Sequence, residues 1–85
     1  MEVSCEFSLY PLGAEHVSPA INAALAVLTR RGLTVESGSM SSLVSGPVET
    51  VFAALAEAFT AAADGGLVLV ATVSNACPTT PSRVG

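Results

Sequence analysis

The stretch EVSCEFSLY, residues 2–10, decides how this 85-residue chain folds, because it alternates apolar and polar side chains without a break. Alternation with a period of two is typical of a β-strand with one apolar face. The polar side chains, which face away from the apolar ones, are Ser4, Glu6, Ser8 and Tyr10. We therefore expect a strand over residues 2–10 that covers a core with one face and ends at Pro11-Leu12-Gly13.

A helix is expected next along the chain. Ser18 precedes Pro19, and a serine N-cap followed by proline at the first helical position is a typical helix start. The helix is predicted to continue to about Arg31, because Gly32 provides a stop signal. Apolar side chains spaced for one face of this helix are Val17, Ile21, Leu25 and Leu28.

The second half of the chain repeats this pattern. Residues 33–37 and 42–45 are predicted as two strands of a hairpin around a turn at residues 38–41. Gly46-Pro47 is expected to open a second helix that ends at Asp64-Gly65-Gly66. The apolar side chains at helical spacing in it are Val48, Val51, Phe52, Leu55 and Phe59. Residues 67–74 then form the most strand-like stretch in the chain.

The predicted order of elements is βαββαβ, which defines the fold class. Two βαβ halves with right-handed crossovers give an α+β, ferredoxin-like fold: a four-stranded antiparallel sheet with both helices on one face. Residues 1–78 are expected to form a single domain, and residues 79–85 a short C-terminal tail.

The sheet face opposite the helices is left uncovered by this arrangement. In the predicted last strand, Val68 and Val70 alternate with Leu67 and Leu69, so both faces of that strand are apolar. Strands that are apolar on both faces are usually buried on both. The chain is also 51% hydrophobic and only 12% charged. We therefore expect a homodimer or homotetramer that forms through the open sheet face or a sheet edge.

The charge balance excludes several classes of partner. Three arginines and no lysine stand against seven carboxylates, for a net charge of −4. Binding to nucleic acid needs clustered cations, so it is not expected, and neither is a basic membrane-surface face. The N-terminus has no basic segment before an apolar run, and no apolar run is long enough to span a membrane. These features predict a cytoplasmic protein, in which Cys5 and Cys77 are expected to be free thiols, with a metal site or a redox pair as the alternative.

The sequence gives no sign of catalysis. It contains no Gly-x-Ser-x-Gly elbow, no HExxH, no Walker motif and no dinucleotide-binding glycine motif. The single histidine, His16, lies in the loop before the first helix, where a solvated side chain is the usual finding. A Cys77 nucleophile would need His16 as its base, and the expected strand pairing puts these two residues at opposite ends of the sheet. We expect no enzyme activity, no metal and no cofactor.

Binding of a small neutral or cationic molecule is what the polar residues favour. Glu6, Ser8 and Tyr10 share one strand face and offer an acceptor, a hydroxyl and an aromatic plane. The serine-rich turn adds further hydroxyls and a methionine. The candidate ligand-binding residues are Glu6, Ser8, Tyr10, Ser39, Met40, Ser41 and Ser42. The alternative is that these are ordinary solvated residues of a sheet surface.

Three segments resemble the YkoF-type family of thiamine- and hydroxymethylpyrimidine-binding proteins. They are EFSLYPLG at residues 6–13, GSMSSLVSG at 38–46 and SNACP at 74–78. The resemblance implies a ferredoxin-like fold and non-catalytic binding of thiamine or its hydroxymethylpyrimidine moiety for salvage, transport or delivery. It also implies assembly of single-unit members as dimers or tetramers. A structural or regulatory oligomerisation module without a small-molecule ligand is the alternative function.

Overall fold

The computed structural model describes residues 1–13, 16, 18–38 and 41–76. Within these residues the elements follow the order βαββαβ. They are β1 (Glu2–Pro11), α1 (Ser18–Arg30), β2 (Thr34–Ser37), β3 (Ser42–Pro47), α2 (Val48–Ala62) and β4 (Leu67–Ser74).

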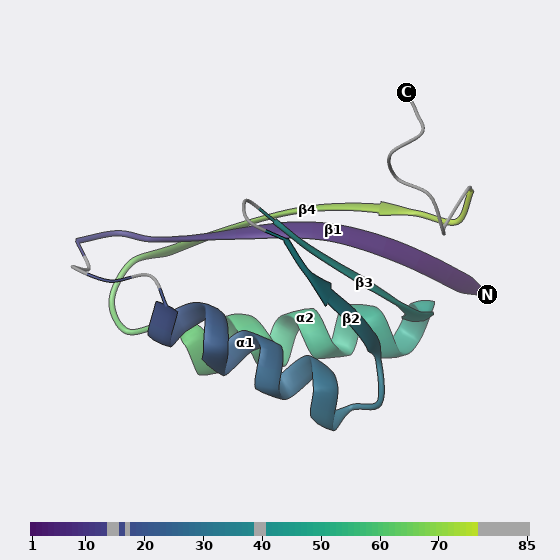
Figure 1. Cartoon of the computed structure of the whole chain (residues 1–85), viewed down its shortest axis with the longest axis horizontal. Coiled ribbons are helices and arrows are strands. Elements are labelled where there is room, and N and C mark those ends of the chain that lie inside the picture. The colour runs from purple at the N-terminus through teal and green to yellow at the C-terminus, as the bar shows by residue number, and fades with distance from the viewer. Residues whose placement is uncertain (14–15, 17, 39–40, 77–85) are drawn as a thin grey trace.

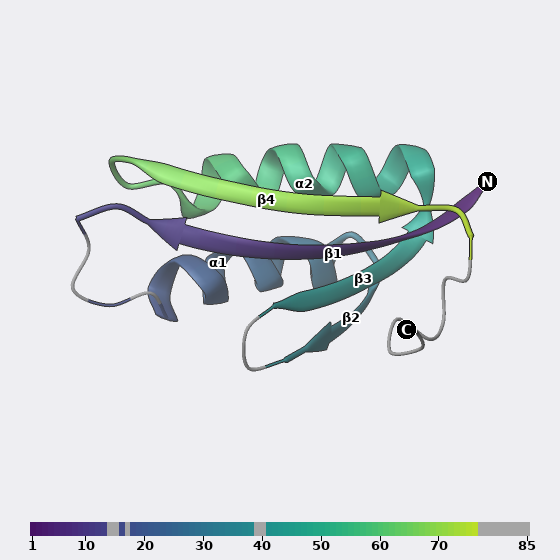
Figure 2. The ribbon, with the colours of Figure 1, turned by 90° about the horizontal axis from the view of Figure 1, so that it is seen from above.

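The strands form one antiparallel sheet in the order β2-β3-β1-β4. Both helices lie on the same side of this sheet, and the opposite side is open (Figure 1). Seen from above, β4 forms one edge with α2 beside it, and β2 forms the other edge (Figure 2). The predicted ferredoxin-like α+β fold, with both helices on one face, is therefore confirmed.

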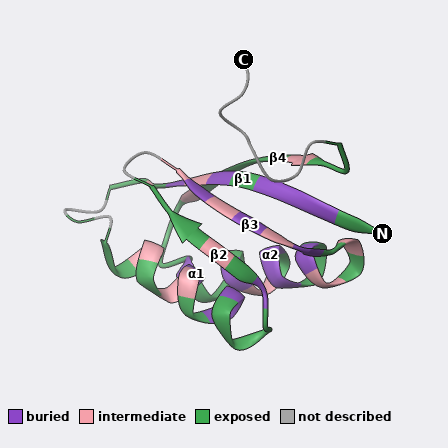
Figure 3. Cartoon of the chain, turned by 45° about the vertical axis from the view of Figure 1, so that its right-hand side comes forward, coloured by how far each residue is buried: buried purple, intermediate pink, exposed green. Residues whose placement is uncertain are grey.

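The alternation in β1 divides its side chains between the core and the open face as predicted. Val3, Cys5, Phe7 and Leu9 are buried, and so is Ser4 of the polar face. Figure 3 shows a long buried stretch of β1 next to its N-terminal end. Cys5 stands opposite Val44 of β3 and Val73 of β4, so the apolar row continues across neighbouring strands. Opposed residues of antiparallel strands point to the same face. The core therefore lies between this face of the sheet and the two helices.

Two strands extend further than the sequence pattern predicted. Pro11 was expected to break β1, but it is the last residue of the strand and pairs with Leu67. Gly46-Pro47 was expected to open the second helix, but both residues belong to β3, and Pro47 is the N-cap of α2. Both prolines are the last residues of their strands, so neither stands in the middle of a strand, where a missing N–H would remove a ladder hydrogen bond.

The buried faces of the helices use smaller side chains than expected. In α1 the buried residues are Ala24, Val27 and Leu28, whereas Ile21 and Leu25 are only partly buried and Val17 lies outside the described residues. In α2 the buried residues are Val51, Ala54, Leu55, Ala58 and Ala62. Phe52 and Phe59 fit the helical spacing but are 53% and 40% exposed. Alanines let the two helices and the sheet approach closely, which leaves the phenylalanines outside.

Gly46 has a steric role in this close packing. It is buried in β3, and an added Cβ would overlap the Cδ2 of Leu33, with Val51 nearby. Glycine is common in strands at positions where another group approaches closely. From the sequence, Gly46 was interpreted as part of a helix start. In the structure it is a strand residue, and its lack of a side chain leaves room for Leu33.

Burial of Cys5 predicts a loss of stability in alkali. Desolvation, with a smaller contribution from the Glu6 charge, raises the pKa of its thiol from 9.0 to about 11. The unfolded chain therefore loses this proton at lower pH than the folded chain does. Stability is unaffected below pH 9 and falls as the pH rises from 9 towards 11, by about 1 kcal/mol at pH 10.

Urea unfolding at pH 8, 9 and 10 measures this effect. The matched variant is Cys5→Ala, which is less stable at every pH because it leaves a small cavity. Its stability should vary less between pH 8 and pH 10 than that of the wild type. Equal pH dependence in the two proteins would contradict the assignment to Cys5.

Neither α1 nor α2 is long and apolar enough to cross a membrane, and the described residues contain no other helix.

Candidate functional site

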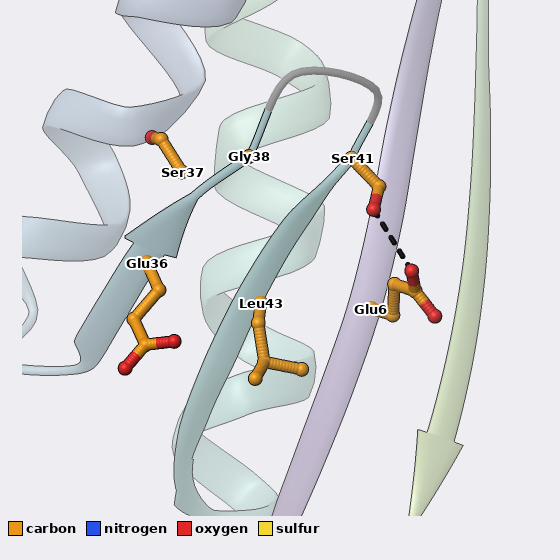
Figure 4. A pocket seen from close by; sticks show the side chains of 6 residues that line it. All are labelled: Glu6, Glu36, Ser37, Gly38, Ser41 and Leu43. Atoms are coloured by element: carbon orange, nitrogen blue, oxygen red, sulfur yellow. Dashed lines mark hydrogen bonds between the residues drawn. The ribbon is translucent and has the colours of Figure 1, made fainter. Parts of the chain in front are cut away.

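A hollow of about 220 Å³ opens on the sheet face that the helices leave uncovered. It lies over β1, β3 and the end of β2. The residues that line it are Glu6, Glu36, Ser37, Gly38, Ser41 and Leu43 (Figure 4). Its walls thus combine carboxylates, hydroxyls and one apolar side chain.

The strand register builds the centre of this hollow. Leu43 of β3 pairs with Glu36 of β2 on one side and with Glu6 of β1 on the other. Paired residues point to the same face, so the leucine lies between two carboxylate-bearing side chains. Figure 4 shows this order from β2 across β3 to β1.

A hydrogen bond orients one of the two carboxylates. The Ser41 hydroxyl donates to Oε2 of Glu6 over 2.8 Å. The backbone of the β2–β3 connection is held nearby, because the Gly38 N–H donates to the Ser41 carbonyl, also at 2.8 Å. The Glu6–Ser41 pair thus presents a hydrogen-bond acceptor and a hydroxyl side by side at the rim of the hollow.

The predicted ligand-binding residues have separate locations. Glu6 and Ser41 line the hollow together. Ser8 and Tyr10 share the face of Glu6 but lie further along β1, opposite Val70 and Val68. Ser42 is buried on the helix-facing side, where it pairs with Phe7. Ser39 and Met40 lie outside the described residues.

Glu36 and Leu43 line the hollow but were not predicted as ligand-binding residues. Both lie in segments that were predicted as strands of one hairpin, so the signal was present in the pairing of those segments. Aligning Ser37 with Ser42 places Glu36 beside Leu43, as the register shows. The position of this hairpin relative to Glu6 depends on the register between β1 and β3, in which Leu43 pairs with Glu6.

The charges are divided between the two sides of the molecule. The arginines among the described residues, Arg30 and Arg31, both contact Glu57 of α2, the latter through its Nε at 2.7 Å. The hydrogen bond from Arg31 is the main reason why the pKa of Glu57 lies below its ordinary value. These groups belong to the helical layer. On the open face, the charged side chains in the described part of the chain are the carboxylates Glu2, Glu6 and Glu36.

A second hollow, of about 290 Å³, lies at the other end of β1, against the start of α1 and the end of α2. It contains His16 and Asp64 among mostly small apolar side chains. The β1–β4 register places Leu67 beside Pro11 and Ser74 beside Ser4. His16 thus lies at the opposite end of the sheet from the end of β4, as expected. Cys77 lies outside the described residues.

A comparison with protein families finds a match to the YKOF-related family over residues 2–80. The chain belongs to this family. The match extends from the start of β1 past the end of β4, so the whole β-sheet and the hollow on it lie within the family region. No curated protein matches the sequence.

Solved structures with the same fold come from several microorganisms. A hypothetical protein of Methanocaldococcus jannaschii has a TM-score of 0.79 and 25% identity, over 86% of this chain and 78% of that one. A domain of unknown function from Bacillus cereus has a TM-score of 0.77 and 19% identity, over 93% and 79%. A Thermotoga maritima protein proposed to act in thiamine biosynthesis or salvage has a TM-score of 0.76 and 17% identity, over 86% and 82%.

Proposed function

We propose that this protein binds thiamine, or its hydroxymethylpyrimidine moiety, without catalysis, and serves salvage, transport or delivery of the vitamin. Membership of the YKOF-related family and the thiamine-related name of one structural neighbour support a thiamine-related role. The observation that carries the proposal is the hollow on the open sheet face, where Glu6 and Ser41 form a hydrogen-bonded pair beside an apolar side chain.

The chemistry of this hollow suits an aminopyrimidine. The exocyclic amino group donates hydrogen bonds, and the Glu6 carboxylate accepts them. The ring nitrogens accept hydrogen bonds, and the Ser41 hydroxyl would turn its single proton from Glu6 to one of them when the ligand binds. Leu43 provides an apolar surface for the flat ring. A charge-assisted hydrogen bond of the kind Glu6 would form contributes about 1.5–3 kcal/mol.

Calorimetric titration tests the proposal with Glu6→Gln as the key variant. Wild-type protein should bind thiamine or hydroxymethylpyrimidine, and Glu6→Gln should weaken that binding by about tenfold or more, because it loses the charged acceptor. Glu49→Gln, in the first turn of α2, is the matched control: it removes the same charge from the helical layer and should bind like the wild type. Absence of binding by the wild-type protein up to millimolar ligand would overturn the proposal.

A second function, self-association into a homodimer or homotetramer, is favoured by exposed apolar side chains at the β4 side. Tyr10, Val68 and Val70 lie together on the open face and are 53%, 42% and 54% exposed. The two sheet edges also differ. The β2 edge is four residues long and carries Glu36, whereas the β4 edge is eight residues long and has no charged residue.

Edge strands that remain exposed are usually short or carry charges, which prevent pairing with another chain. The β2 edge has both protections and the β4 edge has neither. We therefore place the self-association surface at Tyr10, Val68 and Val70, beside the β4 edge. A second copy is the partner that suits an uncharged surface on an acidic chain, because two copies meet there without like charges.

A further inference from the structure

We infer that the hollow is selective for intact, unphosphorylated thiamine, with Glu6 taking the aminopyrimidine and Glu36 neutralising the thiazolium cation. This inference rests on the proposed function and goes further by naming the charge state of the ligand and a specificity residue, Glu36. The observation behind it is that Glu36, Leu43 and Glu6 occupy paired positions on three adjacent strands and so form a row across the sheet.

The spacing of this row suits a ligand with two separate polar ends. Adjacent strands lie about 4.8 Å apart, so the backbones that carry Glu36 and Glu6 are about 10 Å apart. Leu43 fills the position between them, as Figure 4 shows. Thiamine consists of two rings joined by one methylene. It can therefore lie across the leucine with one ring towards each carboxylate.

The two carboxylates have different surroundings, which assigns them to different rings. Glu6 accepts the hydrogen bond of Ser41, so a hydroxyl accompanies it. The carboxylate can accept from the amino group of a pyrimidine, and the hydroxyl can turn its single proton from Glu6 to a ring nitrogen when the ligand binds. No described residue donates a hydrogen bond to the carboxylate of Glu36, which thus acts through its charge. The thiazolium ring carries a fixed positive charge and has no N–H to donate, so charge is the interaction that it needs.

A metal ion does not account for this pair of acids. The described residues include no group of three or more His, Cys, Asp or Glu side chains that could hold a metal. Leu43 also separates Glu36 from Glu6, so the two carboxylates do not converge on one point. Each of them is placed to contact a different part of one larger ligand.

The same charges disfavour phosphorylated forms of the vitamin. Thiamine is a monocation, whereas thiamine diphosphate is an anion at neutral pH. The arginines of the described chain, Arg30 and Arg31, are engaged with Glu57 in the helical layer, away from the open face. A phosphate group over the hollow would therefore meet carboxylates, with neither of the two described arginines beside it to offset them, and like charges repel.

Titrations of three ligands into three proteins test the inference. Wild-type protein should bind thiamine about tenfold more tightly than thiamine diphosphate and more tightly than hydroxymethylpyrimidine, which lacks the cation. Glu36→Gln should weaken thiamine binding by about five- to tenfold and change hydroxymethylpyrimidine binding by less than about twofold. Glu6→Gln should weaken both. Glu36→Asp, which keeps the charge, should recover part of the lost affinity and shows that the loss is not due to misfolding.

The outcomes separate this inference from the proposed function. Two results would overturn the selectivity while leaving thiamine binding intact. One is equal affinity of the wild type for thiamine and thiamine diphosphate. The other is a Glu36→Gln variant whose affinities for thiamine and for hydroxymethylpyrimidine fall by the same factor. No binding of any of the three ligands overturns the proposed function itself. A steeper salt dependence of thiamine affinity in the wild type than in Glu36→Gln would support the charge interaction.

Discussion

In a Leu28→Ala variant, we expect the free energy of unfolding to be about 3 kcal/mol lower than in the wild type. Leu28 is fully buried in α1 and belongs to the core cluster. Removing a buried leucine side chain costs about 2–5 kcal/mol, because transfer energy is lost and a cavity remains. Natural domains have about 0.05–0.15 kcal/mol of stability per residue, so this change removes a large part of the total.

Thermal and urea unfolding of the two proteins measure the loss. The melting temperature should fall by about 12–24 °C, since 1 kcal/mol corresponds to about 4–8 °C in a domain of this size. Leu12→Ala is the matched control, because it removes the same atoms from a side chain that is 60% exposed. A similar loss in the control, or no loss at Leu28, would contradict the core assigned to this helix.

The sequence predicted the strand and helix order because each periodic segment was strong by itself. Residues 67–74 were predicted as a strand, and the structure has β4 over the same residues. The predicted element boundaries were wrong where the same residue type is common in two kinds of element. Gly46 and Pro47 are typical both of helix starts and of strand ends. The structure has both in β3, where Leu33 packs close against Gly46.

The side of α2 that is buried was harder to predict from periodicity than the helix itself. Phe52 and Phe59 follow the helical spacing as well as Val51 and Leu55 do, and they are larger and more apolar than the alanines. The structure buries Ala54, Ala58 and Ala62 instead. The reason is close helix and sheet packing, in which small side chains fit and aromatic rings do not. Tertiary packing of this kind cannot be read from one segment.

The candidate site shows the same limit. Alternation in β1 was sufficient to place Glu6 on the open face. Its relation to Glu36 depends on the register of two further strand pairs, which the sequence of a single chain leaves undetermined. Ser42 illustrates the effect of register: its hydroxyl was grouped with that of Ser41, but the two neighbouring residues point to opposite faces. Only Ser41 lines the hollow.

The Val70→Lys variant is expected to abolish self-association of the protein. Val70 is 54% exposed on the open face, opposite Ser8 and near Val68 and Tyr10. A lysine there places like charges against each other when two copies meet and removes apolar area from the contact. Like-charge juxtaposition at an interface costs several kcal/mol, so the dissociation constant should rise by about 100-fold or more.

Light scattering coupled to size-exclusion chromatography measures this change over a range of protein concentrations. The comparison variant is Phe59→Lys, which replaces another exposed apolar side chain but lies on the outer side of α2. It should keep the wild-type oligomer, because the surface proposed for contact lies on the sheet. An unchanged oligomer in Val70→Lys together with a monomer in Phe59→Lys would move the interface to the helical layer. A wild type that stays monomeric at high concentration would remove the proposal of self-association altogether, leaving the hollow at Glu6 and Glu36 to function in a single chain.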